Sequence, residues 1–406
     1  MLNNNESALI ILTAFVVLLV IGLIISEFSR KLKISNILLL TITGLIMGHF
    51  LSDYALFNIS NNAILTIAVF TLALVVFDGA SRFKARSVDT LSFSALKLSG
   101  LFLSLNMIFI TIATILLFFD FSIANLFYAL IFASIISGTD PASIFIMFNN
   151  KSNRILEFLK IEGILNTPIM VLIPFILLDI LNQILKKSVI SFEAHLAAIL
   201  TQILVGIGSG ILIGLIFFKG IRKFSDQTSG LTLICSALLA FILSENLGGN
   251  GVLAVAVLGF MFGALYMSNK EVLQEFSGML SKSLEILVFL LIGFIVKLNV
   301  DVEFIIKSLV IFAILIITRF IAVKIILRKK EHTREEILFM TFNMPKGIAV
   351  AVLIFSLSFL EAPQISIINN LLLTIIIYSV LLSTIVNKFS EKFINLKIWN
   401  NETFLK

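Results

Sequence analysis

The stretch Ser137-Gly138-Thr139-Asp140-Pro141 interrupts a long apolar run that covers residues 124–148. A proline removes a backbone donor and clashes with the preceding helical turn, so a helix through this run is expected to break near Pro141. An ionisable residue at membrane depth is expensive and is a functional hypothesis by default. The freed carbonyls and the Asp140 carboxylate are therefore predicted to face one polar cavity.

The composition around this stretch predicts a membrane protein. The 406 residues are 59% hydrophobic and only 13% charged, with a mean hydropathy of +1.10. Soluble domains carry roughly a quarter charged residues, so lipid is the expected solvent. The net charge of +6 is expected in loops that face the cytoplasm, and nucleic acid is not an expected partner.

The apolar runs predict an all-α polytopic fold, because each bilayer crossing needs about 20 apolar residues. Thirteen such runs are expected as spans, at approximately 7–26, 34–51, 60–80, 93–119, 124–148, 155–183, 194–217, 230–246, 250–267, 280–298, 304–327, 333–359 and 366–388.

Basic residues in the connecting loops predict the orientation. Arg30, Arg82 and Arg222 and most others follow odd-numbered spans or lie in the tail, whereas the intervening loops hold only Lys186, Lys187, Lys297 and Lys307. The positive-inside rule then places the N-terminus outside and the C-terminus in the cytoplasm, in a cell (inner or plasma) membrane.

Two further spans carry helix-breaking residues. Span six contains Asn166-Thr167-Pro168, and span twelve contains Asn343-Met344-Pro345-Lys346-Gly347, so Pro345 is a second expected break. Spans five and twelve are each the middle of a three-span set, 4–6 and 11–13. Secondary transporters place interrupted helices at corresponding positions of two inverted repeats in this way. The pattern therefore predicts inverted repeats with crossed broken helices.

Asp140 is the candidate ion ligand. A carboxylate can hold either a proton or a hard cation such as Na⁺, and that competition is the simplest basis for exchange of one for the other. Thr139 and Thr167 are expected to add neutral oxygen ligands. Asn166 is expected either to add another or to tie the broken helices together. The alternative for Asp140 is an N-cap of the second half-helix.

Three other charges lie deep within the expected spans. Glu162 needs a buried partner, and Arg319 is the expected one because arginine stays charged and suits buried pairs. We expect this pair to be structural, with Glu162 as a second proton carrier as the alternative. Lys346 lies beside the second break and is expected to compensate half-helix dipoles and a nearby carboxylate, or else to extend its amine to the membrane interface.

These motifs resemble those of the sodium/proton exchanger family of the cation/proton antiporter superfamily. Gly138-Thr139-Asp140-Pro141 is similar to the Thr-Asp-Pro of that family's unwound helix, and Glu162-Gly163-Ile164-Leu165-Asn166-Thr167 is similar to its Glu-Ser-x-x-Asn-Asp. Arg319 matches the arginine that pairs with the family's glutamate, and Pro345-Lys346-Gly347 resembles its Pro-Arg-Gly. The motifs occur in the family's order over nearly the whole membrane region.

The resemblance implies a homodimer in which a mobile core domain moves against a dimerisation domain. The dimerisation domain would comprise residues 1–90 and 230–300, and the core 91–190 and 301–390. Residues 191–229 would form a linker helix and 391–406 a short cytoplasmic tail. The implied activity is exchange of a monovalent cation for protons by alternating access, with Na⁺ favoured and Li⁺ or K⁺ as alternatives, and with no cofactor.

The site departs from the family at two positions. Gly163 stands where the family has serine, and Thr167 stands where it has a second, ion-binding aspartate. Asp140 is then the only titratable ion ligand expected. Because of this departure, the alternative function is that of an altered-site relative that acts as an ion sensor, a passive conductor or a non-transporting regulator. An anion carrier using Lys346 and Arg319 is opposed by Asp140, and an enzyme is not expected because no nucleophile–base or metal constellation is present.

Overall fold

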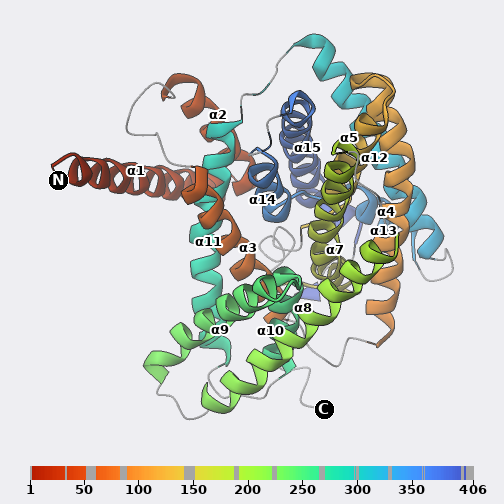
Figure 1. Cartoon of the computed structure of the whole chain (residues 1–406). Helices are drawn as coiled ribbons and strands as arrows, with labels where there is room; N and C mark the ends of the chain where they lie inside the picture. The colour runs from red at the N-terminus through yellow and green to blue at the C-terminus, as the bar shows by residue number, and fades with distance from the viewer. Residues whose placement is uncertain are drawn as a thin grey trace.

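The fold is a bundle of α-helices (Figure 1). The computed structural model describes residues 2–32, 34–51, 61–82, 89–140, 151–186, 192–221, 226–264, 270–296, 298, 301–327, 332–358, 360, 362–394 and 397–398. The helices are α1 (Leu2–Leu32), α2 (Asn36–Leu51), α3 (Asn61–Ser81), α4 (Asp89–Phe118), α5 (Ile123–Ile136), α7 (Arg154–Leu185), α8 (Phe192–Ile221), α9 (Asp226–Asn246), α10 (Gly251–Ala264), α11 (Lys270–Ile295), α12 (Val302–Ile326), α13 (Arg334–Phe342), α14 (Ile348–Leu357) and α15 (Pro363–Lys388).

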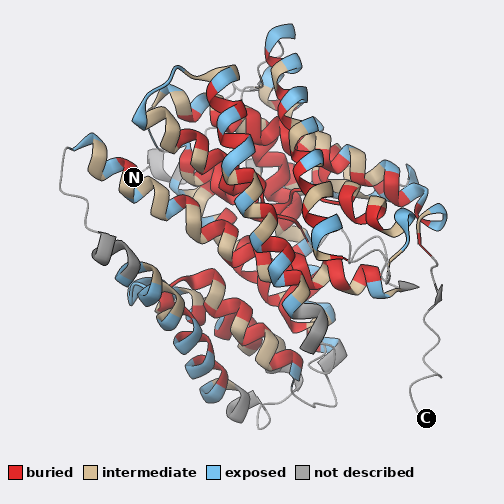
Figure 2. Ribbon diagram, turned by 90° about the vertical axis from the view of Figure 1, so that its right-hand side faces the viewer, coloured by how far each residue is buried: buried red, intermediate tan, exposed pale blue. Residues whose placement is uncertain are grey.

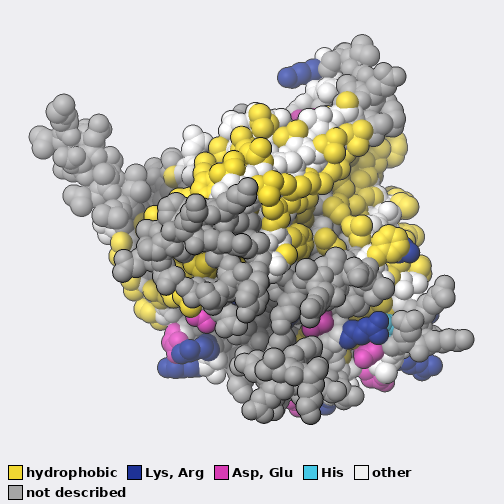
Figure 3. Space-filling view, turned by 90° about the horizontal axis from the view of Figure 1, so that it is seen from below, with side chains coloured by type: hydrophobic (Ala, Val, Ile, Leu, Met, Phe, Trp, Pro, Cys, Tyr) yellow, Lys and Arg dark blue, Asp and Glu magenta, His cyan; other side chains and the backbone are white. Residues whose placement is uncertain are grey.

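The helices are long and apolar, as a membrane fold requires. Within the described residues, seven are long and apolar enough to cross a bilayer: α3, α4, α7, α8, α11, α12 and α15. Five shorter apolar helices, α2, α5, α9, α10 and α14, accompany them. Hydrophobic side chains also cover much of the described part of the face seen in Figure 3. The predicted all-α polytopic fold is confirmed.

One group of helices is built around α11, which packs against α1, α2 and α3. The contact between α2 and α11 is close because both helices carry glycine there. A Cβ atom at Gly44 would collide with the Leu290 carbonyl oxygen, and one at Gly293 would collide with that of Thr41. Small residues permit such backbone approach between helices in membranes. The helices α3, α9 and α10 complete this group, with α8 against α9 and α10.

The second group comprises α4, α5, α7, α12, α13, α14 and α15. Helix α14 joins the two groups, because it contacts α3 and α11 as well as α5, α7 and α15. It is apolar on all sides and almost entirely buried, which is typical of a helix in the middle of a bundle. Buried residues accordingly concentrate along the centre of the molecule in Figure 2.

Both predicted interruptions, at Asp140 and at Pro345, lie in non-helical segments. Helix α5 ends at Ile136, and residues 138–140 have no helical structure. Helix α13 ends at Phe342, α14 begins at Ile348, and residues 343–347 between them are non-helical. The predicted break residue Pro141 lies outside the described residues.

The helix-breaking residues of span six do not interrupt its helix. Helix α7 runs without a break for 32 residues through Pro168 and Pro174. Prolines are tolerated in membrane helices where neighbouring helices and threonine side chains compensate the lost backbone bonds. The Thr167 hydroxyl donates to the Gly163 carbonyl oxygen (2.7 Å), one turn back along the helix. This bond does not replace the one that Pro168 removes, which would have reached the Ile164 carbonyl oxygen. The helix stays continuous beside the site.

Two short features lie outside the helical bundle. Lys151–Ser152 (β1) pairs antiparallel with Lys397–Ile398 (β2), next to the described end of the chain. Between α9 and α10 the chain turns at Gly248, whose φ of 75° lies in the left-handed region that glycine adopts without a steric penalty.

Candidate functional site

The two non-helical segments meet and hydrogen-bond to each other. The Asp140 N–H donates to the Pro345 carbonyl oxygen (2.9 Å), and the Lys346 Nζ donates to the Gly138 carbonyl oxygen (2.6 Å). Proline at 345 leaves the break without an amide donor there, while its carbonyl is free to accept. Each interruption therefore satisfies polar backbone groups of the other, which is what buried irregular backbone requires.

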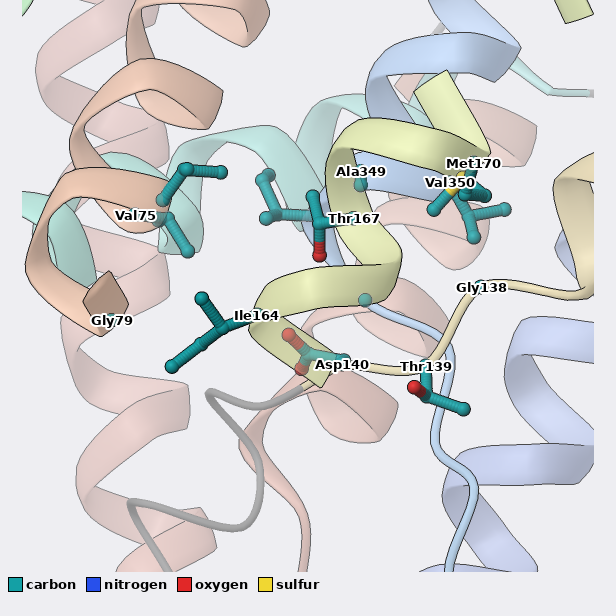
Figure 4. Close-up of a pocket in the computed structure, with 13 residues that line it drawn as sticks. Val75, Gly79, Gly138, Thr139, Asp140, Ile164, Thr167, Met170, Ala349 and Val350 are labelled. Atoms are coloured by element: carbon teal, nitrogen blue, oxygen red, sulfur yellow. The ribbon is translucent and has the colours of Figure 1, made fainter. Parts of the chain in front are cut away.

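A pocket opens beside this crossing. Figure 4 shows Asp140, Thr139 and Thr167 together, and all three line the pocket with Gly138 and Gly347. Its remaining walls are Gly79 and apolar side chains: Val75, Val76, Ile164, Met170, Ile348, Ala349 and Val350. Asp140 retains 5% of its accessible surface, Thr139 7% and Thr167 6%. Thr139, Asp140 and Thr167 thus meet in a mainly apolar pocket, and among the described residues Asp140 is the one carboxylate that lines it.

Gly347 allows Asp140 to occupy this position. A Cβ atom at residue 347 would overlap the Asp140 side chain, because its three nearest atoms are the Cγ, Oδ2 and Cβ of that residue. At Gly347 the backbone of the second interruption therefore packs directly against the Asp140 side chain. Glycine is the residue that permits such a close approach.

Thr167 and Asn166 have different roles in the geometry. The Thr167 hydroxyl uses its proton for the Gly163 carbonyl, which leaves its oxygen lone pairs available on the pocket side. Asn166 does not line the pocket. Its Nδ2 donates to the Ser137 carbonyl oxygen (2.9 Å) and lies 3.4 Å from the Thr139 hydroxyl. These contacts join α7 to the segment that follows α5, and a ligand role for Asn166 stays a prediction.

Glu162 and Arg319 form a two-point ion pair in the second helix group. Arg319 Nη1 and Nη2 donate to Glu162 Oε1 and Oε2 at 2.5 and 2.6 Å. Both side chains are fully buried. The Cζ atom of Arg319 lies 5.0 Å from the centre of the Phe102 ring of α4. The bidentate geometry neutralises both charges and holds α7 against α12.

Lys346 does not extend to a membrane interface, so that alternative is wrong. Its side chain is fully buried, and its amine lies 5.5 Å from the centre of the Phe102 ring as well as on the Gly138 carbonyl. A charge at this place faces the carbonyl end of α5, where the helix dipole is negative. Compensation of the half-helix dipole by Lys346 stays a prediction.

Sequence reasoning missed Phe102 and Asn106 as parts of the site. Asn106 Nδ2 donates to the Ser137 hydroxyl (3.0 Å), and its Oδ1 accepts from the Thr318 hydroxyl (2.7 Å). It therefore links α4, the end of α5 and α12. A lone amide in the apolar run of α4 was the available signal, because a buried amide needs partners.

Within the described ranges, no group of three or more His, Cys, Asp or Glu side chains is placed to hold a metal ion. A single carboxylate with neutral oxygens suits a weakly held monovalent cation better than a tightly held divalent one.

Comparison with known proteins places this geometry in context. The profile of the family described as "Sodium/hydrogen exchanger, transmembrane" matches residues 11–394. The low-affinity Na⁺/H⁺ antiporter NhaS1 of Synechocystis is 26% identical over 335 residues, which are 79% of this chain and 61% of that protein. The K⁺/H⁺ antiporter NhaP2 of Shewanella oneidensis is 24% identical over 60% of this chain and 42% of its own length. The chain thus spans about three fifths of the length of NhaS1 and about two fifths of the length of NhaP2.

The fold is that of a solved antiporter structure. The sodium proton antiporter MjNhaP1 of Methanocaldococcus jannaschii superposes with a TM-score of 0.78 at 20% identity, covering 95% of this chain and 98% of that one. The Na⁺/H⁺ antiporter 1 of the same organism is 24% identical over 82% of this chain and 80% of its own. The family match covers nearly the whole chain and includes both interrupted segments, so this protein belongs to the sodium/hydrogen exchanger family of membrane transporters.

Proposed function

We propose that the protein exchanges a monovalent cation for protons by alternating access, with Asp140 as the titratable ion ligand. The observation that carries this proposal is the Asp140 carboxylate in a nearly closed pocket at the meeting point of two interrupted helices. The family membership and relatives named Na⁺/H⁺ and K⁺/H⁺ antiporters support it.

The exchange follows from competition for one site. With a proton on it, Asp140 is neutral and has no charge to attract a cation. With the proton gone, the carboxylate and the Thr139 and Thr167 oxygens form a site for Na⁺, or for Li⁺ or K⁺. Because the pocket is lined mainly by apolar side chains, an unneutralised carboxylate there is costly. The site is therefore occupied by one or other ion when it changes sides.

The moving parts follow the two helix groups. We assign α4, α5, α7 and α12–α15 to a mobile core, and α1–α3 and α9–α11 to a dimerisation domain, with α8 as the linker. The Glu162–Arg319 pair and the Asn106 and Asn166 amides connect helices inside the proposed core. They would let the core move as one body. A homodimer is expected at twice 45.0 kDa, which light scattering of the purified protein measures.

The decisive variant is Asp140→Asn, assayed in proteoliposomes with an imposed pH gradient. Addition of Na⁺, Li⁺ or K⁺ to the wild type is expected to dissipate the gradient, and the rate is expected to fall at low pH as protons occupy Asp140. In the variant, the cation-dependent rate of gradient dissipation is expected to be lower by at least about 10²-fold, because its pocket has no titratable ion ligand. Ser104→Ala, on the exposed side of α4, is the matched control for a neutral substitution.

The substitution at Thr167 favours one other reading, a relative that senses ions or regulates without transport. It removes the carboxylate that the family pattern has beside Asp140. A wild-type protein that gives no response to any of the three cations, or an Asp140→Asn variant with the wild-type rate, would overturn the proposed exchange.

A further inference from the structure

Helix α15 carries a stripe of buried polar side chains that the proposed exchange does not use. Ser379, Ser383 and Asn387 recur every four residues and therefore lie on one face of the helix. All three are buried, and most of the other buried residues of α15 are apolar. Because a buried polar group is costly unless it is hydrogen-bonded, the partners of this polar stripe indicate what it does.

Two members of the polar stripe form a closed ring of hydrogen bonds with Asn343, the first residue of the second interruption. The Ser383 hydroxyl donates to Asn343 Oδ1 (2.5 Å), Asn343 Nδ2 donates to Asn387 Oδ1 (2.8 Å), and Asn387 Nδ2 donates to the Ser383 oxygen (3.1 Å). Each side chain thus donates one bond and accepts one within the ring. The ring holds the Asn343 amide in one orientation, because turning it over would bring donor against donor and acceptor against acceptor.

The third member of the polar stripe holds the interruption at a second point. Ser379 Oγ accepts from the backbone N–H of Lys346 (3.2 Å), and its hydroxyl donates to the Ile376 carbonyl oxygen (3.0 Å). Ser379 and Ser383 are one helical turn apart, so α15 holds both residue 343 and residue 346. The backbone from 343 to 347 is not helical. Its position therefore depends on hydrogen bonds to neighbouring elements.

The segment held in this way is the one that meets Asp140. The Pro345 carbonyl oxygen accepts from the Asp140 N–H (2.9 Å), and the Lys346 amine donates to the Gly138 carbonyl oxygen (2.6 Å). Gly347 packs against the Asp140 side chain. A displacement of the second interruption would therefore move the partners of Asp140. The polar stripe does not itself line the Asp140 pocket, so it acts on the site only through the interruption.

We infer that the polar stripe of α15 positions the cation site: it fixes the second interruption and thereby sets where the Asp140 carboxylate lies relative to the Thr167 oxygen. This inference rests on the proposed exchange at Asp140. A cation is bound well only when its oxygen ligands are at coordination distance together, so a small displacement of one ligand weakens binding. Loss of the stripe should therefore lower cation affinity, whereas a purely structural role would lower only the amount of active transporter.

The test is Ser383→Ala in proteoliposomes, with the initial rate of exchange measured against Na⁺ concentration. The substitution removes one donor and one acceptor from the ring, so the apparent KM for Na⁺ is expected to rise about tenfold while kcat changes by less than about twofold. Ser383→Thr keeps the hydroxyl and is expected to keep the KM within about twofold of the wild type. Ser379→Ala removes the other attachment and is expected to raise the KM as well.

Ser308→Ala is the matched control. Its hydroxyl is also buried and also links to α15, because it lies 3.1 Å from the Tyr378 hydroxyl, but its other hydrogen bond is to the Ile305 carbonyl oxygen of its own helix α12. Loss of this hydroxyl is expected to leave the KM for Na⁺ unchanged, even where it lowers the unfolding midpoint.

A second measurement does not depend on turnover. A bound cation raises the unfolding midpoint of the purified protein in proportion to its occupancy, so the Na⁺ concentration needed for a given rise reports affinity. That concentration is expected to be about tenfold higher in Ser383→Ala than in Ser308→Ala.

Three results would each overturn the positioning role: an unchanged KM in Ser383→Ala, a lower kcat at unchanged KM, or an equal rise in KM in Ser308→Ala. If Ser383→Ala does not fold, Ser379→Ala decides by the same criteria. These results leave the exchange proposal standing, whereas a wild type that responds to none of Na⁺, Li⁺ and K⁺ contradicts the exchange itself.

Discussion

At the scale of single residues, the site depends on a few buried polar groups that neutralise one another. Arg319 and Lys346 both lie beside the Phe102 ring, and each has its own oxygen partner, the Glu162 carboxylate and the Gly138 carbonyl. Asp140 remains the carboxylate that faces the pocket. In the proposed exchange, Asp140 is the group that responds to ions.

The Glu162–Arg319 pair gives a prediction at this scale. Glu162→Met is expected to destabilise the protein by about 3–5 kcal/mol, because it leaves a buried guanidinium without its counter-charge. The double variant Glu162→Met/Arg319→Met is expected to regain most of that loss, since a buried ion pair and an apolar replacement are often similar in stability. Thermal unfolding in detergent measures both. Losses that simply add in the double variant would mean that the two side chains do not act as a pair.

At the scale of helices, the interruptions are built from local chemistry but are stabilised by each other. Pro345 and Gly347 end one helix and admit Asp140 against the next. Helix α7 contains Pro168 and Pro174 yet continues, because a proline alone removes one donor and the surrounding helices hold the rest. The two non-helical segments, by contrast, hydrogen-bond to each other, so that each provides partners for backbone groups of the other.

Gly347→Ala tests the contact between the two interruptions. The added methyl group would overlap the Asp140 carboxyl, so the carboxylate is expected to shift and exchange to fall by about 10²-fold, as for other misplaced reactive groups. The unfolding midpoint is expected to change little by comparison. Gly100→Ala on α4 is the matched control, because no atom lies within 4 Å of the added Cβ. Equal exchange rates in the two variants would contradict the steric argument.

At the scale of the whole molecule, two helix groups meet along α14, which both groups bury. The proposed exchange requires one group to move against the other while the pocket opens to alternate sides. The orientation of the bundle then decides which side each opening faces, and we expect the basic loops to lie in the cytoplasm.

The orientation can be tested with single cysteines in a Cys235→Ser background. Leu247→Cys, in the exposed turn between α9 and α10, is expected to react with an impermeant maleimide added to intact cells. Lys392→Cys, after α15, is expected to react only after the membrane is permeabilised. The reverse pattern would contradict the assignment from loop charges.

The sequence by itself determined the membrane class, most helices, the two interruptions and the resemblance to a family, because hydropathy, proline and charge act locally. Asp140 and the expected partnership of Glu162 with Arg319 could also be predicted, since a deep charge needs a reason or a partner. Only the tertiary structure decided that Asp140 bonds to Pro345 and that Gly347 admits its side chain. These contacts join segments far apart in the chain, and no local preference of the backbone specifies them.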